Sequence, residues 1–173
     1  SILIANNART ILSEKNIELI ADQLIYDQKI STIKALGNVE INDLLNNIKF
    51  KSGEAIYNKN KRTITSNAKS SLSDKPGNNF ITEQFIYTFD DNLIKIFKSK
   101  ITDIQNNVYH IENAFLNPIT NKLIGKDILI DFNSLAENNE PRMSGKTISS
   151  DKDKTIIEKG VFTTCKRNDD CPP

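Results

Sequence analysis

The residues that could carry chemistry in this chain are few, and the two cysteines are the most specific of them. Cys165 and Cys171 both lie in the last nine residues. Their spacing fits neither a Cys-x-x-Cys redox pair nor a four-ligand zinc site, because the further ligands of such a site are missing. We therefore predict a disulfide, either between these two cysteines or from one of them to a cysteine in another part of a longer chain. Either arrangement indicates an oxidising compartment.

The remaining titratable residues do not form a catalytic or metal-binding pattern. His110 is the one histidine, and its place in an extended stretch is typical of an ordinary strand residue. The acids at 90–91 and at 151 and 153 fall in predicted turns, where such side chains bond the local backbone. The ordered ligand spacing of a calcium loop and the clustered glycines of a phosphate loop are both missing. We predict that the chain is not an enzyme and uses no metal ion or cofactor.

Length and charge exclude other classes of protein. The chain has 173 residues, which suits one domain. Its 23 basic residues are balanced by 22 acidic ones, so nucleic acid is not an expected partner. The hydrophobic fraction of 38% indicates a thin or open core, and no apolar run is long enough for a membrane-spanning helix. The abrupt start and the end at Pro173 suggest a piece of a longer protein.

The elements that would position these residues come from a phrase that recurs about every 30 residues. The copies are ADQLIY at 21–26, SGEAIY at 52–57, TEQFIY at 82–87 and, more loosely, IENAFL at 111–116 and SGKTIS at 144–149. Each copy is followed by a polar turn and a second extended run. In the run at 32–41, apolar and polar residues alternate with a period of two, which is typical of a half-buried strand. A helix over 12–24 is the alternative for that segment.

Each repeat thus predicts a hairpin, and stacked hairpins would form a twisted, two-walled, all-β sheet with one apolar inner face. A filled sandwich is the ordinary outcome of such packing. Small and polar residues among the inward positions and the absence of tryptophan favour an open groove instead. The residues that we expect to line it are Ile33, Val39, Ile41, Phe50, Tyr57, Ile64, Phe85, Ile94, Ile96, Ile124, Ile128 and Ile130.

An open stack leaves strand edges that can pair with another chain. The first residues, Ile2, Leu3 and Ile4, favour a β-strand and include no lysine or proline to discourage such pairing. They predict an edge for β-augmentation by a partner, or alternatively a strand that pairs within its own domain.

The phrase ADQLIY at 21–26, running into ALGNVEI at 35–41, resembles the repeat of the OstA-like β-jellyroll family of lipopolysaccharide-transport proteins. LptA, LptC and the N-terminal domain of LptD share that repeat. The resemblance covers essentially the whole chain. It implies an open β-jellyroll, also called a β-taco, whose apolar groove takes the acyl chains of lipopolysaccharide.

The run TIIEKGVFTTC at 155–165 is similar to the junction between the periplasmic domain of LptD and its outer-membrane barrel. This similarity implies a jellyroll domain at 1–162 and a cysteine-containing segment at 163–173 that leads to a barrel of the same chain. The domain would accept lipopolysaccharide from an LptA-like bridge protein at the periplasmic face of the Gram-negative outer membrane. Cys165 matches the family cysteine that pairs with the barrel, whereas Cys171 departs from the family pattern.

Two alternatives remain open. A free-standing bridge protein of the LptA or LptC kind would share the repeat but lack the junction run. A β-solenoid surface module or carbohydrate-binding module would also share the repeat, and should display aromatic or polar ladders on its outer face.

Overall fold

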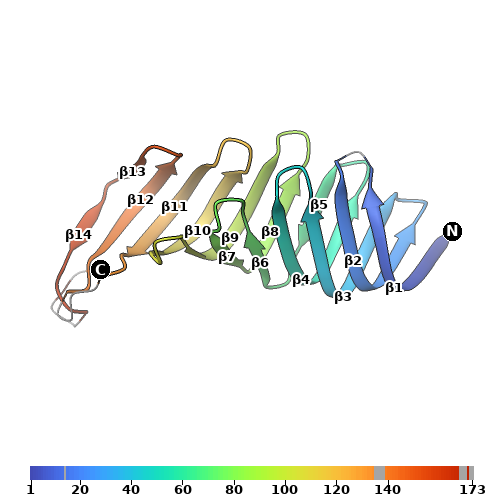
Figure 1. The fold of residues 1–173 in the computed structure, drawn as a ribbon, viewed down its shortest axis with the longest axis horizontal. Helices are drawn as coiled ribbons and strands as arrows, with labels where there is room; N and C mark the ends of the chain where they lie inside the picture. The colour runs from blue at the N-terminus through green and yellow to red at the C-terminus, as the bar shows by residue number, and fades with distance from the viewer. Residues whose placement is uncertain (14, 135–138, 168–170, 172–173) are drawn as a thin grey trace.

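The computed structural model describes residues 1–13, 15–134, 139–167 and 171, and these form one antiparallel sheet of 14 strands (Figure 1). The predicted all-β class is confirmed. In chain order the strands are β1 (Ile2–Leu12), β2 (Ile17–Asp27), β3 (Thr32–Asp43), β4 (Ile48–Asn58), β5 (Thr63–Ser66), β6 (Ser70–Ser73), β7 (Asn79–Thr82), β8 (Gln84–Thr88), β9 (Leu93–Thr102), β10 (Val108–Asn117), β11 (Lys122–Asp131), β12 (Arg142–Ser150), β13 (Thr155–Glu158) and β14 (Val161–Thr163). The helical alternative for 12–24 is wrong, because that segment contains the end of β1 and most of β2.

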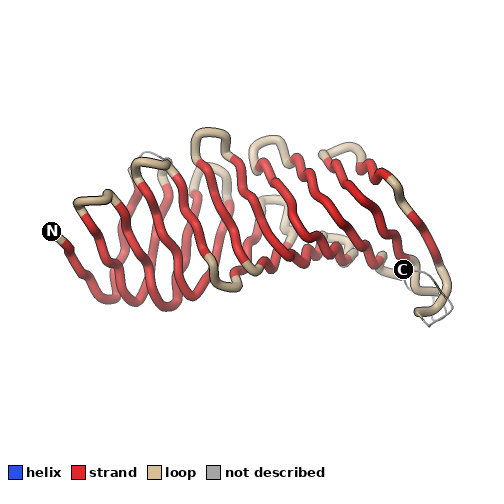
Figure 2. Tube along the Cα trace, turned by 180° about the vertical axis from the view of Figure 1, so that it is seen from behind, coloured by secondary structure: helices blue, strands red, loops and turns tan. Residues whose placement is uncertain are grey.

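Each long strand pairs with the next along the chain, so the hairpins stack in sequence order from the N-terminus to the C-terminus (Figure 2). In the middle of the stack β4 pairs with β5 at one end and with β6 at the other, and β9 pairs with β8 and β7 in the same way. The pairs β5–β6 and β7–β8 therefore take the places of single long strands that have been interrupted.

Every long strand bends near its middle, and the bends divide the sheet into two walls. Non-glycine residues with positive φ stand at the bends of four strands, namely Asn7, Asn38, Lys98 and Asp127, and Lys159 stands between β13 and β14. A left-handed residue inside a strand turns the chain sharply, and asparagine and aspartate adopt this conformation more readily than most residues. In β3 the register of pairing also shifts, between Leu36 and Val39, whereas the pairings across Asn7, Lys98 and Asp127 keep a continuous register.

We name the walls by their residues. Wall A consists of 2–6, 23–27, 32–36, 54–58, 93–97, 113–117, 122–126 and 147–150 with β5, β8 and β13. Wall B consists of 8–12, 17–21, 39–43, 48–52, 99–102, 108–111, 128–131 and 142–145 with β6, β7 and β14. One apolar core lies between the walls. Phe50 of wall B, for example, stacks on Phe85 of wall A with ring centroids 4.7 Å apart.

The bends also change which residues face inward, and this corrects the predicted placement of Ile124. Ile124 is 47% exposed and lies on the outer face of wall A, whereas Ile128 and Ile130 beyond the bend are buried. Simple alternation places all three on one face. The left-handed backbone at Asp127 reverses the alternation within β11 while its pairing register with β10 and β12 stays continuous, so the inward residues are odd-numbered before the bend and even-numbered after it.

Close packing between the walls predicts a stability effect at Gly125. A Cβ on this residue of wall A would lie 2.9 Å from Cγ2 of Ile111, 3.1 Å from Cγ2 of Ile148 and 3.2 Å from the carbonyl oxygen of Asn113. Gly125→Ala should therefore lower the free energy of unfolding by about 1–3 kcal/mol, measured by urea denaturation. Gly53→Ala is the control, since its Cβ would meet nothing within 4 Å. Equal denaturation midpoints for the two variants would contradict this account.

Candidate functional site: the mouth between the walls

The turns that join the strands form two lips along the open margin of the walls. We call the gap between these lips the mouth. Lip A consists of the turns at 28–31, 59–62, 89–92, 118–121 and 151–154, and lip B of those at 44–47, 74–78 and 103–107 together with 15–16. Local side chains build these turns. Asp43, Asp74 and Asp103 each accept backbone amides from their own turn and the side-chain amide of an asparagine at its end.

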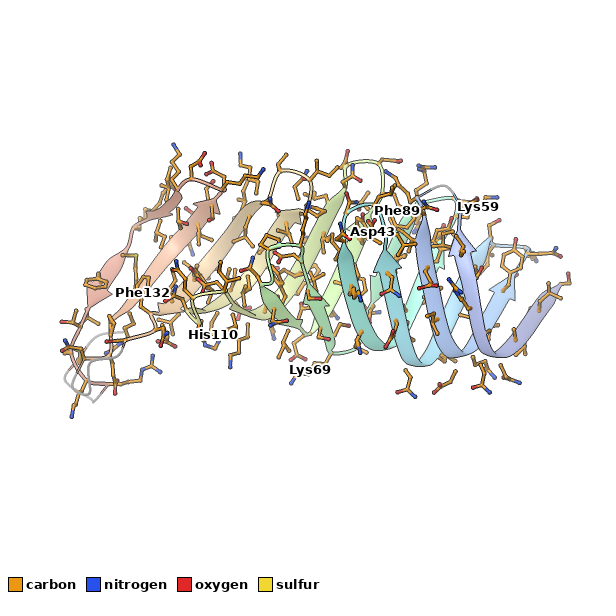
Figure 3. The ribbon with its side chains drawn as sticks, in the orientation of Figure 1. Asp43, Lys59, Lys69, Phe89, His110 and Phe132 are labelled. Atoms are coloured by element: carbon orange, nitrogen blue, oxygen red, sulfur yellow. A yellow bond between two sulfur atoms is a disulfide. The ribbon has the colours of Figure 1, made fainter. Side chains whose placement is uncertain are left out.

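In the N-terminal half of the stack (β1–β6 and β8) the two lips are tied together. The hydroxyl of Tyr87 in wall A donates to Oδ2 of Asp43 in wall B at 2.5 Å, and Nδ2 of Asn46 donates to the same Oδ2 at 2.8 Å. Tyr87 is fully buried and Asp43 is 2% exposed. Burial and the bond to Asp43 raise the pKa of Tyr87 well above its usual range. Figure 3 labels Asp43 and Phe89 at this margin of the stack.

A second tie lies beside the first, where Nζ of Lys15 donates to Oδ1 of Asn92 at 3.3 Å. Beneath both ties the interior is filled by aromatic rings. Tyr87 lies 5.2 Å from Phe89 and 5.9 Å from Phe50 between ring centroids. This half of the structure is a closed hydrophobic core.

In the C-terminal half (β7 and β9–β14) the lips stand apart, and two adjoining cavities open between the walls. The first has a volume of about 460 Å³ and the second about 680 Å³, both within the range of ligand-binding pockets. They share Gln105 and Tyr109. The apolar residues of the first are Phe80, Ile101, Ile104, Leu116, Leu123 and Ile148, and those of the second are Ile130, Phe132, Met143, Ile157 and Phe162.

At this open mouth the tyrosine–aspartate bond stays on the side of wall B and does not join the two lips. The hydroxyl of Tyr109 donates to Oδ2 of Asp103 at 3.0 Å, and both residues belong to wall B and its lip. Burial and the neighbouring Asp103 carboxylate raise the pKa of Tyr109 to about 12. A tyrosine–aspartate pair thus occurs in both halves, but only the pair in the N-terminal half joins the walls.

Most of the residues predicted to line the groove do lie between the walls. Val39, Ile41, Phe50, Tyr57, Ile64, Phe85, Ile94, Ile96, Ile128 and Ile130 are buried, Ile33 is half-buried and Ile124 faces outward. Of these, Ile130 alone lines one of the two open cavities. Sequence reasoning missed Leu116, Leu123 and Ile148, which line the first cavity. Leu116 is the last residue of one copy of the repeated phrase, and Ile148 is the last but one of another. Reading the alternation separately on each side of the bend would have found Leu123.

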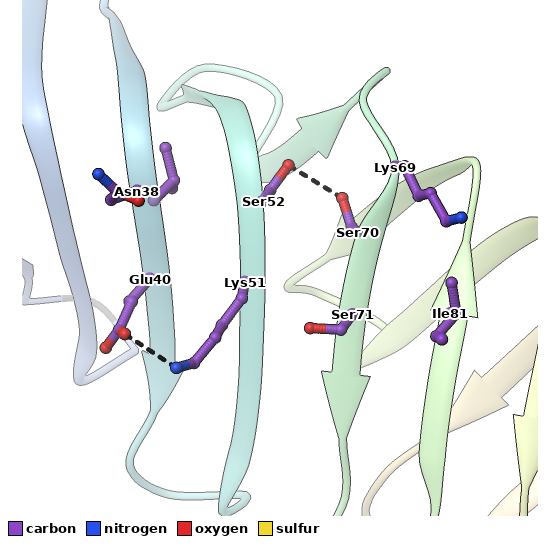
Figure 4. Close-up of a pocket in the computed structure, with 9 residues that line it drawn as sticks. Asn38, Glu40, Lys51, Ser52, Lys69, Ser70, Ser71 and Ile81 are labelled. Carbon is purple, nitrogen blue, oxygen red and sulfur yellow. Dashed lines mark hydrogen bonds and ion pairs between the residues drawn. The ribbon is translucent and has the colours of Figure 1, made fainter.

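A separate hollow of about 460 Å³ lies beside the bends of β3 and β4, on the outer face of wall B (Figure 4). Its rim carries the ion pair between Lys51 and Glu40, at 3.2 Å. Ser52 and Ser70 are joined by a hydrogen bond of 2.9 Å where the interrupted strands meet. Its polar and charged lining does not suit an acyl chain.

The two ends of the sheet carry free edges. Ile2, Leu3 and Ile4 are 62%, 58% and 62% exposed, and β1 pairs with β2 alone among the described strands. At the other end β13 and β14 both pair with β12.

The two cysteines form a disulfide with each other, one of the arrangements that the sequence left open. The bridged segment lies against Arg142 of β12, which is 1% exposed and donates to the Cys165 carbonyl at 2.8 Å. Residues 168–170 and 172–173 of the expected C-terminal segment lie outside the described residues.

Within the described ranges the chain forms no helix with the length and hydropathy needed to cross a bilayer. The same residues contain no group of three or more histidine, cysteine, aspartate or glutamate side chains placed to hold a metal ion.

Comparison with known proteins gives likenesses among solved structures alone. No protein-family model and no curated protein matches the sequence. Among solved structures, the chain is similar to the crystal structure of LptH, the LptA-homologous periplasmic component of the lipopolysaccharide transport device of Pseudomonas aeruginosa. The TM-score is 0.47 and the sequence identity 13%, over 68% of this chain and 76% of that one.

Proposed function

We propose that this chain is a periplasmic lipid-conduit domain that carries the acyl chains of lipopolysaccharide. The observation that supports the proposal is an apolar interior between two walls of one sheet, open along its C-terminal half. Each buried methylene of an acyl chain contributes about 0.8 kcal/mol. An apolar trough with few fixed polar contacts therefore holds a long chain and still lets it slide.

Photo-crosslinking tests this proposal at paired positions on β11 and β12. Ile130 and Met143 are cross-strand partners that both line the larger cavity. Crosslinkers at these two positions should capture lipopolysaccharide. Their neighbours Leu129 and Ser144 are also cross-strand partners but lie on the outer face of wall B, so crosslinkers there should capture little. Equal labelling of the inner and outer pairs would contradict the proposal.

We further propose that β1 receives a bridge protein of similar fold by β-augmentation. The amide of Gln28 donates to the Ser1 carbonyl at 3.1 Å. In an antiparallel pair, alternate residues bond the neighbouring strand, so the amide of Leu3 points toward β2 and that of Ile4 toward the free edge. The 11 residues of β1 contain no lysine or proline to blunt this edge.

Ile4→Pro should therefore weaken association with an LptA-like bridge protein by about tenfold without unfolding the domain. The substitution removes one outward donor and leaves the bonds to β2 in place, and a hydrogen bond contributes about 0.5–1.5 kcal/mol. Ile4→Thr keeps the donor and is the control. Affinity is measured by biolayer interferometry. An unchanged affinity for Ile4→Pro would contradict the proposal that the bridge protein pairs with β1.

The finer proposal is that residues 1–162 are the N-terminal domain of an LptD-type chain, with 163–173 leading to an outer-membrane barrel. The run at 155–165 supports it, and the architecture fits a free-standing bridge protein equally well. The gene sequence following the codon of Pro173 tests it: a series of amphipathic strand segments is the expected result, and a stop codon would favour the bridge protein.

A further inference from the structure

The two halves of the mouth differ in one respect that bears on how a lipid enters. In the N-terminal half a buried tyrosine–aspartate bond joins the walls, and in the C-terminal half the corresponding bond stays within wall B and its lip. The interior is filled beneath the first bond and hollow beside the second.

We propose that acyl chains enter sideways through the C-terminal half of the mouth. The hydrogen bond between Tyr87 and Asp43 keeps them out of the N-terminal half until that bond breaks. This inference rests on the proposed function and names the entry site and the closing residues. The occupant of the open half is the hydrocarbon part of an amphiphile, because the inward side chains of both walls there are mainly apolar and the polar residues of the lining lie mostly in the lips.

The bond between Tyr87 and Asp43 can be lost without disrupting the turn or the core that hold its two partners. Oδ1 of Asp43 accepts the amides of Leu45 and Asn46 at 3.1 and 2.9 Å, so the turn of lip B is held without help from the tyrosine. Tyr87 is held by its neighbours in the aromatic core. Loss of the hydroxyl therefore removes this buried link between the lips and leaves the bond between Lys15 and Asn92, while both walls keep their internal hydrogen bonds.

The position of the bond suits a closing role. Asp43 and Tyr87 are 44 residues apart in the chain and come from opposite walls. The tie between Lys15 and Asn92 lies in the same half of the structure. In the C-terminal half the turns at 74–78 and 103–107 face those at 118–121 and 151–154 across the smaller cavity.

Crosslinking at two inward positions tests the proposal. Ile130 lines the open half, and Ile33 is a half-buried inward residue of the closed half. In the unmodified protein, a crosslinker at Ile130 should capture lipopolysaccharide and one at Ile33 should capture about tenfold less. Tyr87→Phe should raise capture at Ile33 by about tenfold, the scale on which one hydrogen bond to a charged group contributes.

Tyr109→Phe is the matched control, because it removes the same hydroxyl from a bond that does not cross the mouth, and it should leave capture at Ile33 unchanged. If Tyr87→Phe loses cooperative unfolding, Asp43→Asn becomes the deciding variant, since it keeps the oxygen that holds the turn. Capture at Ile33 equal to that at Ile130 in the unmodified protein, or no increase in the deciding variant, would overturn the proposal. Absence of capture at both positions in every variant would overturn the proposed function as well.

Discussion

Replacing Leu123 with glutamate should weaken lipopolysaccharide binding by about 100-fold while the domain stays folded. Leu123 is half-buried in wall A and lines the smaller open cavity with Leu116 and Ile148. In the free protein a carboxylate there still reaches water through the mouth. A bound acyl chain would remove that water, and burying an unpaired charge costs several kcal/mol, of which about 2.8 correspond to 100-fold in affinity. Affinity is measured by titration with lipopolysaccharide.

The control for this variant is the next residue of the same strand. Ile124 is 47% exposed on the outer face of wall A, so Ile124→Glu introduces the same charge on β11 without meeting the cavity. Its affinity should stay within about twofold of the unmodified protein, as expected for a surface charge far from the ligand. Equal losses for Leu123→Glu and Ile124→Glu would show that the charge acts at a distance and that the cavity is not the binding site.

Phe85→Ala should lower the free energy of unfolding by about 3–5 kcal/mol, because it leaves a cavity in a closed core. Phe85 is 1% exposed, and its ring stacks on Phe50 across the walls. The change is measured by urea denaturation followed by circular dichroism. The size of the effect reports whether the N-terminal half is a filled core, since truncation inside an empty trough would remove few contacts.

Phe115→Ala is the matched control for that measurement. Phe115 is 39% exposed on the outer face of wall A, where the ammonium of Lys95 lies 5.4 Å from its ring centroid. The truncation should cost about 1 kcal/mol or less, since a cation–π contact at an exposed site is worth about 0.5–1 kcal/mol. A similar loss for both phenylalanines would contradict a closed core in the N-terminal half.

Local regularities of the sequence were enough to predict the architecture. The phrase ending in Tyr26, Tyr57 and Tyr87 marks successive hairpins, and the polar turns between the extended runs mark their ends. Strand, turn and pairing with the next strand depend on residues close together in the chain, so a repeat of about 30 residues is sufficient to predict a stack. The exposed edge at Ile2, Leu3 and Ile4 follows from the same regularity.

The inward face was predicted only in part, because one left-handed residue reverses the alternation within a strand. Asp127 moves Ile124 to the outside and brings Leu123 to the inside. Nothing in the types of these residues marks Asp127 as left-handed, since an aspartate on the outer face of a regular strand would look the same in the sequence. The hydrogen-bonded register between neighbouring strands decides which face each residue takes.

The tertiary structure alone decided which half of the mouth is closed. Each half contains a strand tyrosine whose partner is an aspartate at or just after the end of another strand, and the sequence does not distinguish Tyr87 from Tyr109. Tyr87 reaches a partner in the opposite wall, whereas Tyr109 bonds within its own wall. The separation of the walls at each point depends on side-chain volumes from strands far apart in the chain, such as Phe50 and Phe85. Periodicity within one strand carries no information about that separation.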